Sequence, residues 1–119
     1  LNYCILILIS TGSEVSLCLE ASKKLQEMNV NTRVVSMPCW ELYDKQSKEY
    51  KESILPKDIN NRISVEAGTS IGWSQYVGDS GISIGINDFG ESAPGKIIME
   101  KKGFSVENIC NTYKKLLER

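Results

Sequence analysis

The chain has 119 residues, of which 41% are hydrophobic and 24% are charged, a composition that favours one globular domain over a disordered segment. Its 14 basic and 15 acidic residues give a net charge of −1, so the sequence predicts no nucleic-acid or anionic-membrane partner. The longest apolar run, Cys4–Ile9, is too short to span a bilayer and lacks the flanks of a signal peptide, so we expect a cytoplasmic protein.

The first elements of the chain form the pattern of a βαβ unit. The apolar run Cys4–Ile9 is typical of a strand buried on both faces of a parallel sheet. Thr11 and Glu14 have the spacing of a capping box, which predicts a helix from there to about Met28. A second strand is expected over Thr32–Met37. The buried face of the helix is predicted as a stripe of Val15, Cys18, Leu19, Leu25 and Met28, with Ser22 as a small exception.

The alternation of strands and helices continues along the chain. Asp44 is expected to cap a short helix that ends near Ile54. Residues 62–66 and 81–86 are predicted strands, with a short helix around residues 72–77 between them. Alternation of this kind predicts an α/β fold, with a mostly parallel sheet and helices on both faces.

Two helices are expected in the last third of the chain. The first covers residues 93–101, and the second begins after Ser105, which is suited to cap it. The second helix has an apolar stripe formed by Val106, Ile109, Cys110, Tyr113, Leu116 and Leu117.

The four cysteines and the absence of histidine limit the chemistry that the chain can perform. No two cysteines form a Cys-x-x-Cys pair, so we interpret them as small hydrophobic residues of a reduced protein rather than as zinc ligands. The absence of histidine removes the commonest general base. The cysteines are Cys4, Cys18, Cys39 and Cys110.

Any ligand site is expected at the edge of the sheet where the parallel strands end. The loop Thr11, Gly12 and Ser13 is a candidate anion site, because backbone N–H groups at a helix N-terminus attract negative charge. Glu14 would compete for the same field, and the loop lacks the glycines and lysine of a P-loop, so an ordinary helix start is the alternative.

Four carboxylates and five aromatic residues are further candidates for a functional site. A catalytic or metal-binding carboxylate pair is possible, although Asp44 is also explained as a helix cap and Asp88 as a turn residue. The aromatic residues are interpreted as packing or interface side chains, because no basic groove accompanies them. The carboxylates are Glu41, Asp44, Glu66 and Asp88, and the aromatic residues are Trp40, Trp73, Tyr43, Tyr50 and Tyr76.

Five sequence blocks, taken in order, resemble the C-terminal domain of transketolases. They are Ile7–Val15, Val35–Leu42, Ser64–Gly68, Asp88–Gly90 and Gly103–Phe104. The resemblance implies a three-layer αβα fold with a mostly parallel sheet, spanning residues 1–119 as one domain. It also implies that an antiparallel strand found first in the family precedes this chain. Because Leu1 lies almost at the first buried strand, we expect a fragment of a longer chain.

The function implied by this resemblance belongs to the longer enzyme. Transketolases transfer a two-carbon ketol unit between sugar phosphates in the pentose phosphate pathway, and they use thiamine diphosphate with a divalent cation, Mg or Ca. The resemblance places these groups in upstream domains, so no catalytic, cofactor-binding or metal-binding residue is expected here. The implied partners are those upstream domains and a second subunit of a homodimer, and the implied role of this domain is structural, dimer-forming and inactive alone.

Three alternative functions remain open from the sequence. The loop Thr11–Glu14 could belong to a regulatory module that binds a phosphorylated metabolite. Trp40, Trp73 or an uncovered sheet edge could instead dock another protein. The chain could also be the third domain of a related enzyme, deoxyxylulose-phosphate synthase or the β component of a 2-oxoacid dehydrogenase, although the blocks around Trp40 and Asp88 favour transketolase.

Overall fold

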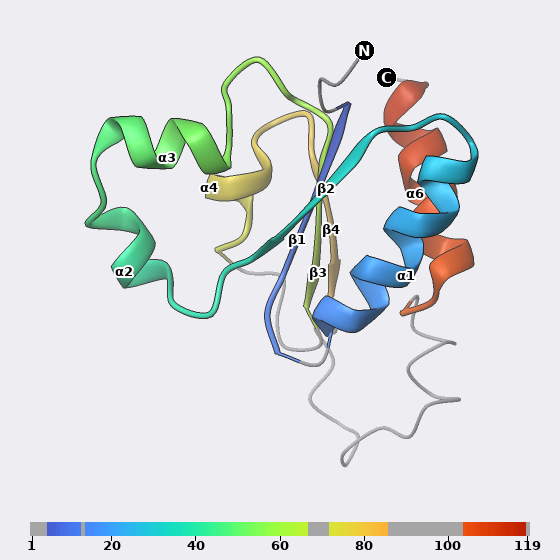
Figure 1. The fold of residues 1–119 in the computed structure, drawn as a ribbon, viewed down its shortest axis with the longest axis horizontal. Coiled ribbons are helices and arrows are strands. Elements are labelled where there is room, and N and C mark those ends of the chain that lie inside the picture. The colour runs from blue at the N-terminus through green and yellow to red at the C-terminus, as the bar shows by residue number, and fades with distance from the viewer. Residues whose placement is uncertain (1–4, 13, 67–71, 86–103, 119) are drawn as a thin grey trace.

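The computed structural model describes residues 5–12, 14–66, 72–85 and 104–118 (Figure 1). The elements in chain order are β1 (Leu6–Ser10), α1 (Glu14–Glu27), β2 (Thr32–Ser36), α2 (Trp40–Asp44), α3 (Lys48–Ile54), β3 (Arg62–Glu66), α4 (Ser74–Val77), β4 (Ile82–Gly85) and α6 (Val106–Leu117). The predicted helix over residues 93–101 lies outside the described residues. No helix in the described ranges is long and apolar enough to cross a membrane.

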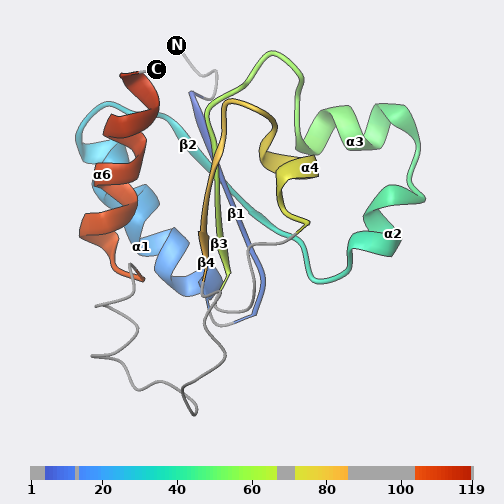
Figure 2. The same cartoon turned by 180° about the vertical axis from the view of Figure 1, so that it is seen from behind.

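The four described strands form one parallel sheet in the order β2-β1-β3-β4. In this register Leu8 of β1 lies between Val34 of β2 and Ile63 of β3. Helices α1 and α6 cover one face of the sheet, and α2, α3 and α4 lie on the other (Figures 1 and 2). The predicted α/β fold with a three-layer αβα architecture is therefore confirmed.

The direction of the strand connections explains why both faces are covered. The step from β1 to β2 runs one way across the sheet, whereas the steps from β2 to β3 and from β3 to β4 run the other way. Because crossovers between parallel strands are right-handed, a reversal of direction sends the connecting helices to the opposite face. Helix α1 consequently lies on one side, and α2, α3 and α4 lie on the other (Figure 1).

Strand β1 contributes to a hydrophobic core on each face of the sheet. Leu6 and Leu8 pack into the core beneath α1 and α6, whereas Ile7 and Ile9 pack into the core beneath α2 and α4. All four side chains are fully buried. The alternation follows from the two-residue period of a strand, and the continuous apolar run reflects burial on both sides.

Helix α1 begins later than the capping-box prediction requires. Glu14 is its first residue rather than its third, so Thr11 is not the N-cap. The Thr11 hydroxyl instead donates to the carboxylate of Glu66, a residue distant in sequence. The capping-box prediction is therefore wrong, because a tertiary hydrogen bond takes the side chain that local spacing assigned to the helix.

The buried face of α1 is also rotated from the predicted stripe. Leu19 is 48% exposed and Met28, beyond the helix end, is 43% exposed, so both predictions of burial are wrong. Cys18 and Leu25 of the predicted stripe are buried, and Ala21, which was not predicted, is buried with them. Residues spaced three or four apart lie on one face of a helix, and this is the face that α1 turns toward the sheet. The buried residues of α1 are Glu14, Cys18, Ala21 and Leu25.

The helix predicted to start after Asp44 is α3, which begins later, and α2, which was not predicted, precedes it. Asp44 ends α2, and α3 begins only after Ser47, whose hydroxyl accepts the N–H of Tyr50 at 3.2 Å. The Asp44 carboxylate instead accepts a hydrogen bond from the hydroxyl of Tyr76 at 3.1 Å. The N-cap prediction for Asp44 is thus wrong, because its carboxylate has a distant partner while Ser47 performs the capping.

The predictions for strand β3 and helix α6 are confirmed more closely. Strand β3 covers the predicted residues 62–66, and the Ser105 hydroxyl accepts the N–H of Asn108 at 3.1 Å as the N-cap of α6. The predicted stripe of α6 faces the core, with one exception. Leu117 is 60% exposed, and Thr112 is buried in addition, donating its hydroxyl to the carbonyl of Asn108 at 2.7 Å.

The burial of the cysteines predicts a difference in thiol reactivity. Cys18 and Cys110 lie in the core, whereas Cys39 is partly exposed. Burial raises the pKa of Cys18 to about 11 and also raises the pKa of Cys110. Because the thiolate is the reactive form, iodoacetamide at pH 8 should alkylate Cys39 while Cys18 and Cys110 stay unmodified until the chain is unfolded. Mass spectrometry of the peptides separates the sites, and alkylation of native Cys18 at the rate of Cys39 would contradict this expectation.

Candidate functional site

The carboxyl edge of the sheet contains a switch point between β1 and β3. These neighbouring strands are followed by α1 and α4, which lie on opposite faces (Figure 1). Ligands of open parallel sheets bind in the crevice that such a divergence creates. Thr11 follows β1 and Glu66 ends β3, and the Thr11 hydroxyl donates to the Glu66 carboxylate at 2.5 Å. The hydrogen bond therefore spans the position where the fold would place a ligand.

The predicted anion site lies at this edge. Gly12 is exposed and has a φ of +57°, a left-handed conformation that favours glycine, and Ser13 lies outside the described residues. Glu14 is 6% exposed at the start of α1, and Glu66 lies beside Thr11. These two carboxylates oppose the attraction that the helix N-terminus has for a second anion. The assignment of Thr11, Gly12 and Ser13 as an anion site stays a prediction.

The four predicted carboxylates are found in different environments. Glu41 is exposed on α2, Asp44 accepts from Tyr76, and Glu66 accepts from Thr11. Asp88 lies outside the described residues. Within the part of the chain that the structure describes, no three His, Cys, Asp or Glu side chains form a group that could hold a metal ion.

Four aromatic side chains connect α2 to α4. The rings of Trp40 and Trp73 are 5.0 Å apart at 84°, and the rings of Trp40 and Tyr76 are 5.5 Å apart at 61°. Tyr43 packs edge-to-face on Tyr76 at 5.7 Å. The interpretation of these residues as packing aromatics is confirmed for this cluster. Tyr50 is not part of it and is 49% exposed.

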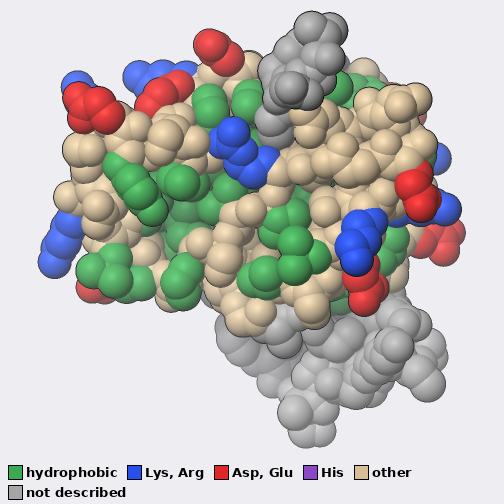
Figure 3. Space-filling view, in the orientation of Figure 1, with side chains coloured by type: hydrophobic (Ala, Val, Ile, Leu, Met, Phe, Trp, Pro, Cys, Tyr) green, Lys and Arg blue, Asp and Glu red, His purple; other side chains and the backbone are tan. Residues whose placement is uncertain are grey.

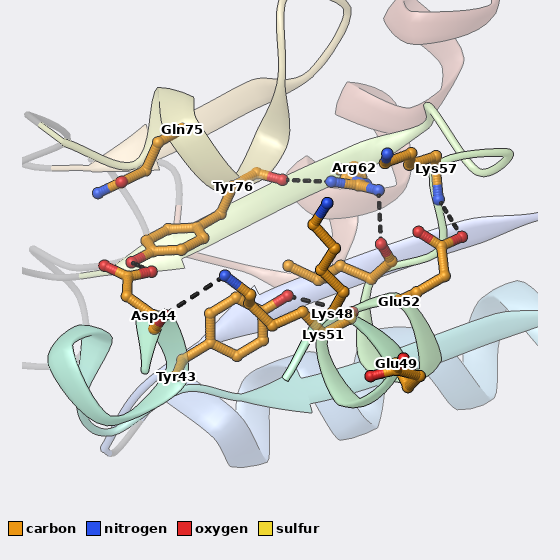
Figure 4. Close-up of a pocket in the computed structure, with 11 residues that line it drawn as sticks. Tyr43, Asp44, Lys48, Glu49, Lys51, Glu52, Lys57, Arg62, Gln75 and Tyr76 are labelled. Atoms are coloured by element: carbon orange, nitrogen blue, oxygen red, sulfur yellow. Dashed lines mark hydrogen bonds between the residues drawn. The ribbon is translucent and has the colours of Figure 1, made fainter. Parts of the chain in front are cut away.

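A cavity of about 730 Å³ lies between α2, α3, α4 and the start of β3 (Figure 4). Tyr43, Tyr76 and Leu55 form its apolar walls. Its charged lining is Asp44, Lys48, Glu49, Lys51, Glu52, Lys57 and Arg62. No local pattern in the sequence marks the basic residues of this lining as a site, because they are spread over three segments whose proximity only the fold establishes.

Arg62 forms one wall of the cavity and binds four backbone carbonyls. Its Nε donates to Ile59 at 2.9 Å and its Nη1 to Tyr76 at 2.8 Å, while its Nη2 donates to Leu55 at 3.2 Å and to Pro56 at 2.7 Å. These bonds attach the loop before β3 to α4. Burial lowers the pKa of Arg62, and the charges of Tyr43 and Glu52 act in the opposite direction.

A second groove of about 510 Å³ lies beside the edge strand β2. On the face drawn in Figure 3, hydrophobic side chains gather over β2, α2 and α3. Leu42, which is 62% exposed, and Tyr50 line this groove, and Arg33 crosses it to donate to the carbonyls of Ser53 and Ile54.

Comparison with known proteins identifies the family of this domain. Residues 4–105 match the sequence model of the transketolase-like TK C-terminal domain. The chain belongs to this family. A transketolase of Nostoc sp. is 50% identical over 112 residues, which are 94% of this chain and 17% of that protein. The chain therefore spans about a sixth of the length of the relatives that it matches.

Solved transketolase structures contain the same fold. A transketolase from Leishmania mexicana superimposes with a TM-score of 0.87 at 38% identity, over 100% of this chain and 17% of that one. A transketolase of Pichia stipitis, in complex with sedoheptulose-7-phosphate, has a TM-score of 0.86 at 35% identity, over 99% of this chain and 17% of that one. The family match extends from before β1 to the N-cap of α6, so it includes both the switch point and the cavity of this transketolase C-terminal domain.

Substitution of Arg62 should destabilise this transketolase domain more than substitution of Arg33. Arg62→Lys loses the planar guanidinium that holds four carbonyls, so the free energy of unfolding should fall by about 3 kcal/mol. Arg33→Lys is the matched control, because Arg33 donates to two adjacent carbonyls through one nitrogen, and its loss should cost less than about 1 kcal/mol. Urea denaturation followed by circular dichroism measures both values, and equal losses would contradict the role given to Arg62.

Two glycines with positive φ test the packing of the aromatic cluster. A Cβ at Gly72 would lie 2.7 Å from Cζ3 of Trp40, whereas a Cβ at Gly78 would meet nothing within 4 Å. Both Gly→Ala substitutions incur the backbone cost of about 1 kcal/mol, but only Gly72→Ala adds an overpacking cost of about 1–3 kcal/mol. Gly72→Ala should therefore give the lower urea midpoint and a changed tryptophan emission. The same emission in both variants would show that Trp40 does not contact this turn.

Proposed function

We propose that this chain is the C-terminal domain of a transketolase that transfers a two-carbon ketol unit from a ketose phosphate to an aldose phosphate. The observation that carries the proposal is the family match over residues 4–105, together with identities of 49–50% to transketolases over 92–94% of the chain. Binding of sedoheptulose-7-phosphate by the similar Pichia stipitis enzyme supports a sugar-phosphate substrate. Residues 1–119 are proposed to form one domain of a longer cytoplasmic protein.

The cofactor of the proposed reaction is thiamine diphosphate with a divalent cation, Mg or Ca, which supplies the carbanion chemistry of ketol transfer. A diphosphate of this kind is held through a cation with oxygen ligands. The match of this chain to the C-terminal domain alone, at about 17% of the length of its relatives, supports cofactor binding by other domains of the longer protein. We therefore assign cofactor binding to those domains and derive no chemical step for this one.

The role that we assign to this domain is structural and dimer-forming. Two observations support this role: the domain has a hydrophobic core on each face of its sheet, and large apolar side chains are exposed on its surface. Leu42 and Tyr50 are large, exposed and beside the apolar groove on β2, and Leu19 and Leu117 are exposed on the opposite layer. Apolar side chains that gather in one groove, as Leu42 and Tyr50 do, are characteristic of contacts with other domains or subunits.

Activity and binding measurements on two forms of the protein test the proposal. The longer protein should convert a ketose phosphate and an aldose phosphate when thiamine diphosphate and Mg²⁺ are present, and sedimentation should give a dimer. The 119-residue chain should show no turnover, and calorimetric titration with thiamine diphosphate and Mg²⁺ should give no binding heat. Turnover or cofactor binding by the 119-residue chain would contradict the structural role, and a longer protein without ketol transfer would contradict the enzymatic assignment.

A further inference from the structure

The cavity between α3, α4 and β3 carries cationic groups that form no ion pair with the described residues. The ammonium groups of Lys48 and Lys57 line the cavity and have no hydrogen-bond or ion-pair partner within the described ranges. Figure 4 shows the ends of both side chains and the guanidinium of Arg62 pointing into the same part of the cavity. Lys51 differs from them, because its ammonium group donates to the carbonyl of Asp44 at 3.3 Å.

The acidic residues of the lining form no ion pair with Lys48, Lys57 or Arg62 among the described residues. The Glu52 carboxylate accepts the backbone N–H of Lys57 at 2.9 Å, and the Asp44 carboxylate accepts the Tyr76 hydroxyl at 3.1 Å. The carboxylate of Glu49 points away from the three cationic groups in Figure 4. The Glu52 charge acts on Arg62, so this part of the cavity has three basic groups, those of Lys48, Lys57 and Arg62, against one carboxylate and is positive. The whole lining has four basic and three acidic residues.

The guanidinium of Arg62 is the fixed element of this positive region. Its four described hydrogen bonds go to neutral carbonyls, so they orient the group without cancelling its charge. A guanidinium has five N–H groups, and one N–H of Nη1 has no partner among the described residues. Desolvation of the group, which lowers the pKa of Arg62, would be offset by an anion in the cavity.

We propose that this cavity binds a small organic phosphate, with the phosphoryl group between Lys48, Lys57 and Arg62. A phosphoryl group matches this set because it accepts several charge-assisted hydrogen bonds at once from ammonium and guanidinium donors. The rings of Tyr43 and Tyr76 and the side chain of Leu55 contact the organic part of the ligand, and a volume of about 730 Å³ accommodates a sugar phosphate or a nucleotide.

The proposed phosphate site is distinct from the anion site predicted at the start of α1. Arg62 is the first residue of β3, whereas Thr11 and Glu66 lie at the carboxyl ends of β1 and β3. The two positions are at opposite edges of the sheet. The inference also stands apart from the proposed ketol transfer, since it assigns a binding site and no chemical step.

Calorimetric titration of the 119-residue chain tests the proposal with ribose 5-phosphate, ADP, inorganic phosphate and ribose. At least one of the two organic phosphates should bind at one molecule per chain, more tightly than inorganic phosphate, and ribose should not bind. Lys48→Gln combined with Lys57→Gln should weaken that binding by about tenfold or more, because it removes both free ammonium groups. Added salt should weaken binding as well, since the attraction is electrostatic.

A matched double variant provides the control. Lys23→Gln combined with Lys115→Gln removes two exposed cations from α1 and α6, on the opposite face of the sheet, and should leave the affinity unchanged. An equal loss in both double variants would show a general charge effect and overturn the site. Binding of neither organic phosphate at millimolar concentration, or binding no tighter than that of inorganic phosphate, would also overturn it. Preference between ribose 5-phosphate and ADP then identifies the class of organic group that Tyr43 and Tyr76 contact.

Discussion

Burial of β1 is the constraint on which the other layers depend. Every residue of this strand is fully buried, and both of its edges are paired, to β2 and to β3. A strand in this position must have its polar backbone groups bonded within the sheet and its side chains covered on both faces. Leu6 and Leu8 require one helical layer and Ile7 and Ile9 require the other, so the three-layer architecture follows from a strand of five residues.

The reversal of strand order next to β1 then determines where polar groups can gather. The connections leave β1 and β3 for opposite faces, so the carboxyl edge opens between these two strands, and there the Thr11 hydroxyl bonds to the Glu66 carboxylate. At the amino edge, the start of β3 lies beside α3 and α4, and Arg62 binds the carbonyls of both connecting segments. The carboxyl edge therefore has the carboxylates of Glu14 and Glu66, whereas the cavity at the amino edge is lined by four basic and three acidic residues.

The layer of α2, α3 and α4 is stabilised by tertiary side-chain contacts, because its helices are short. Helices of five, seven and four residues have little stability of their own and depend on tertiary contacts. The edge-to-face rings of Trp40, Trp73, Tyr43 and Tyr76 supply one set of contacts, and the carbonyls bound by Arg62 supply another. These helices are short and leave space over the sheet. The same layer consequently contains the cavity and the groove. The opposite layer, with α1 and α6, packs through longer helices.

The sequence by itself determined the strand positions, the parallel α/β class and the family, because a continuous apolar run, a Ser cap before an amphipathic stripe and ordered motif blocks are local patterns. It could not determine which partner a polar side chain takes. Thr11 bonds to Glu66 and Asp44 to Tyr76, pairs separated by 55 and 32 residues, and both replaced a locally predicted cap. The buried face of α1 likewise depended on how the helix is rotated over the sheet, so Ala21 lies in the core and Leu19 does not. The cations around the cavity carried no local signal either, because Lys48, Lys57 and Arg62 come together only when α3 packs beside β3. Tertiary structure decided these features, since the free energy of a side-chain contact depends on groups that the fold, rather than the neighbouring sequence, brings within reach.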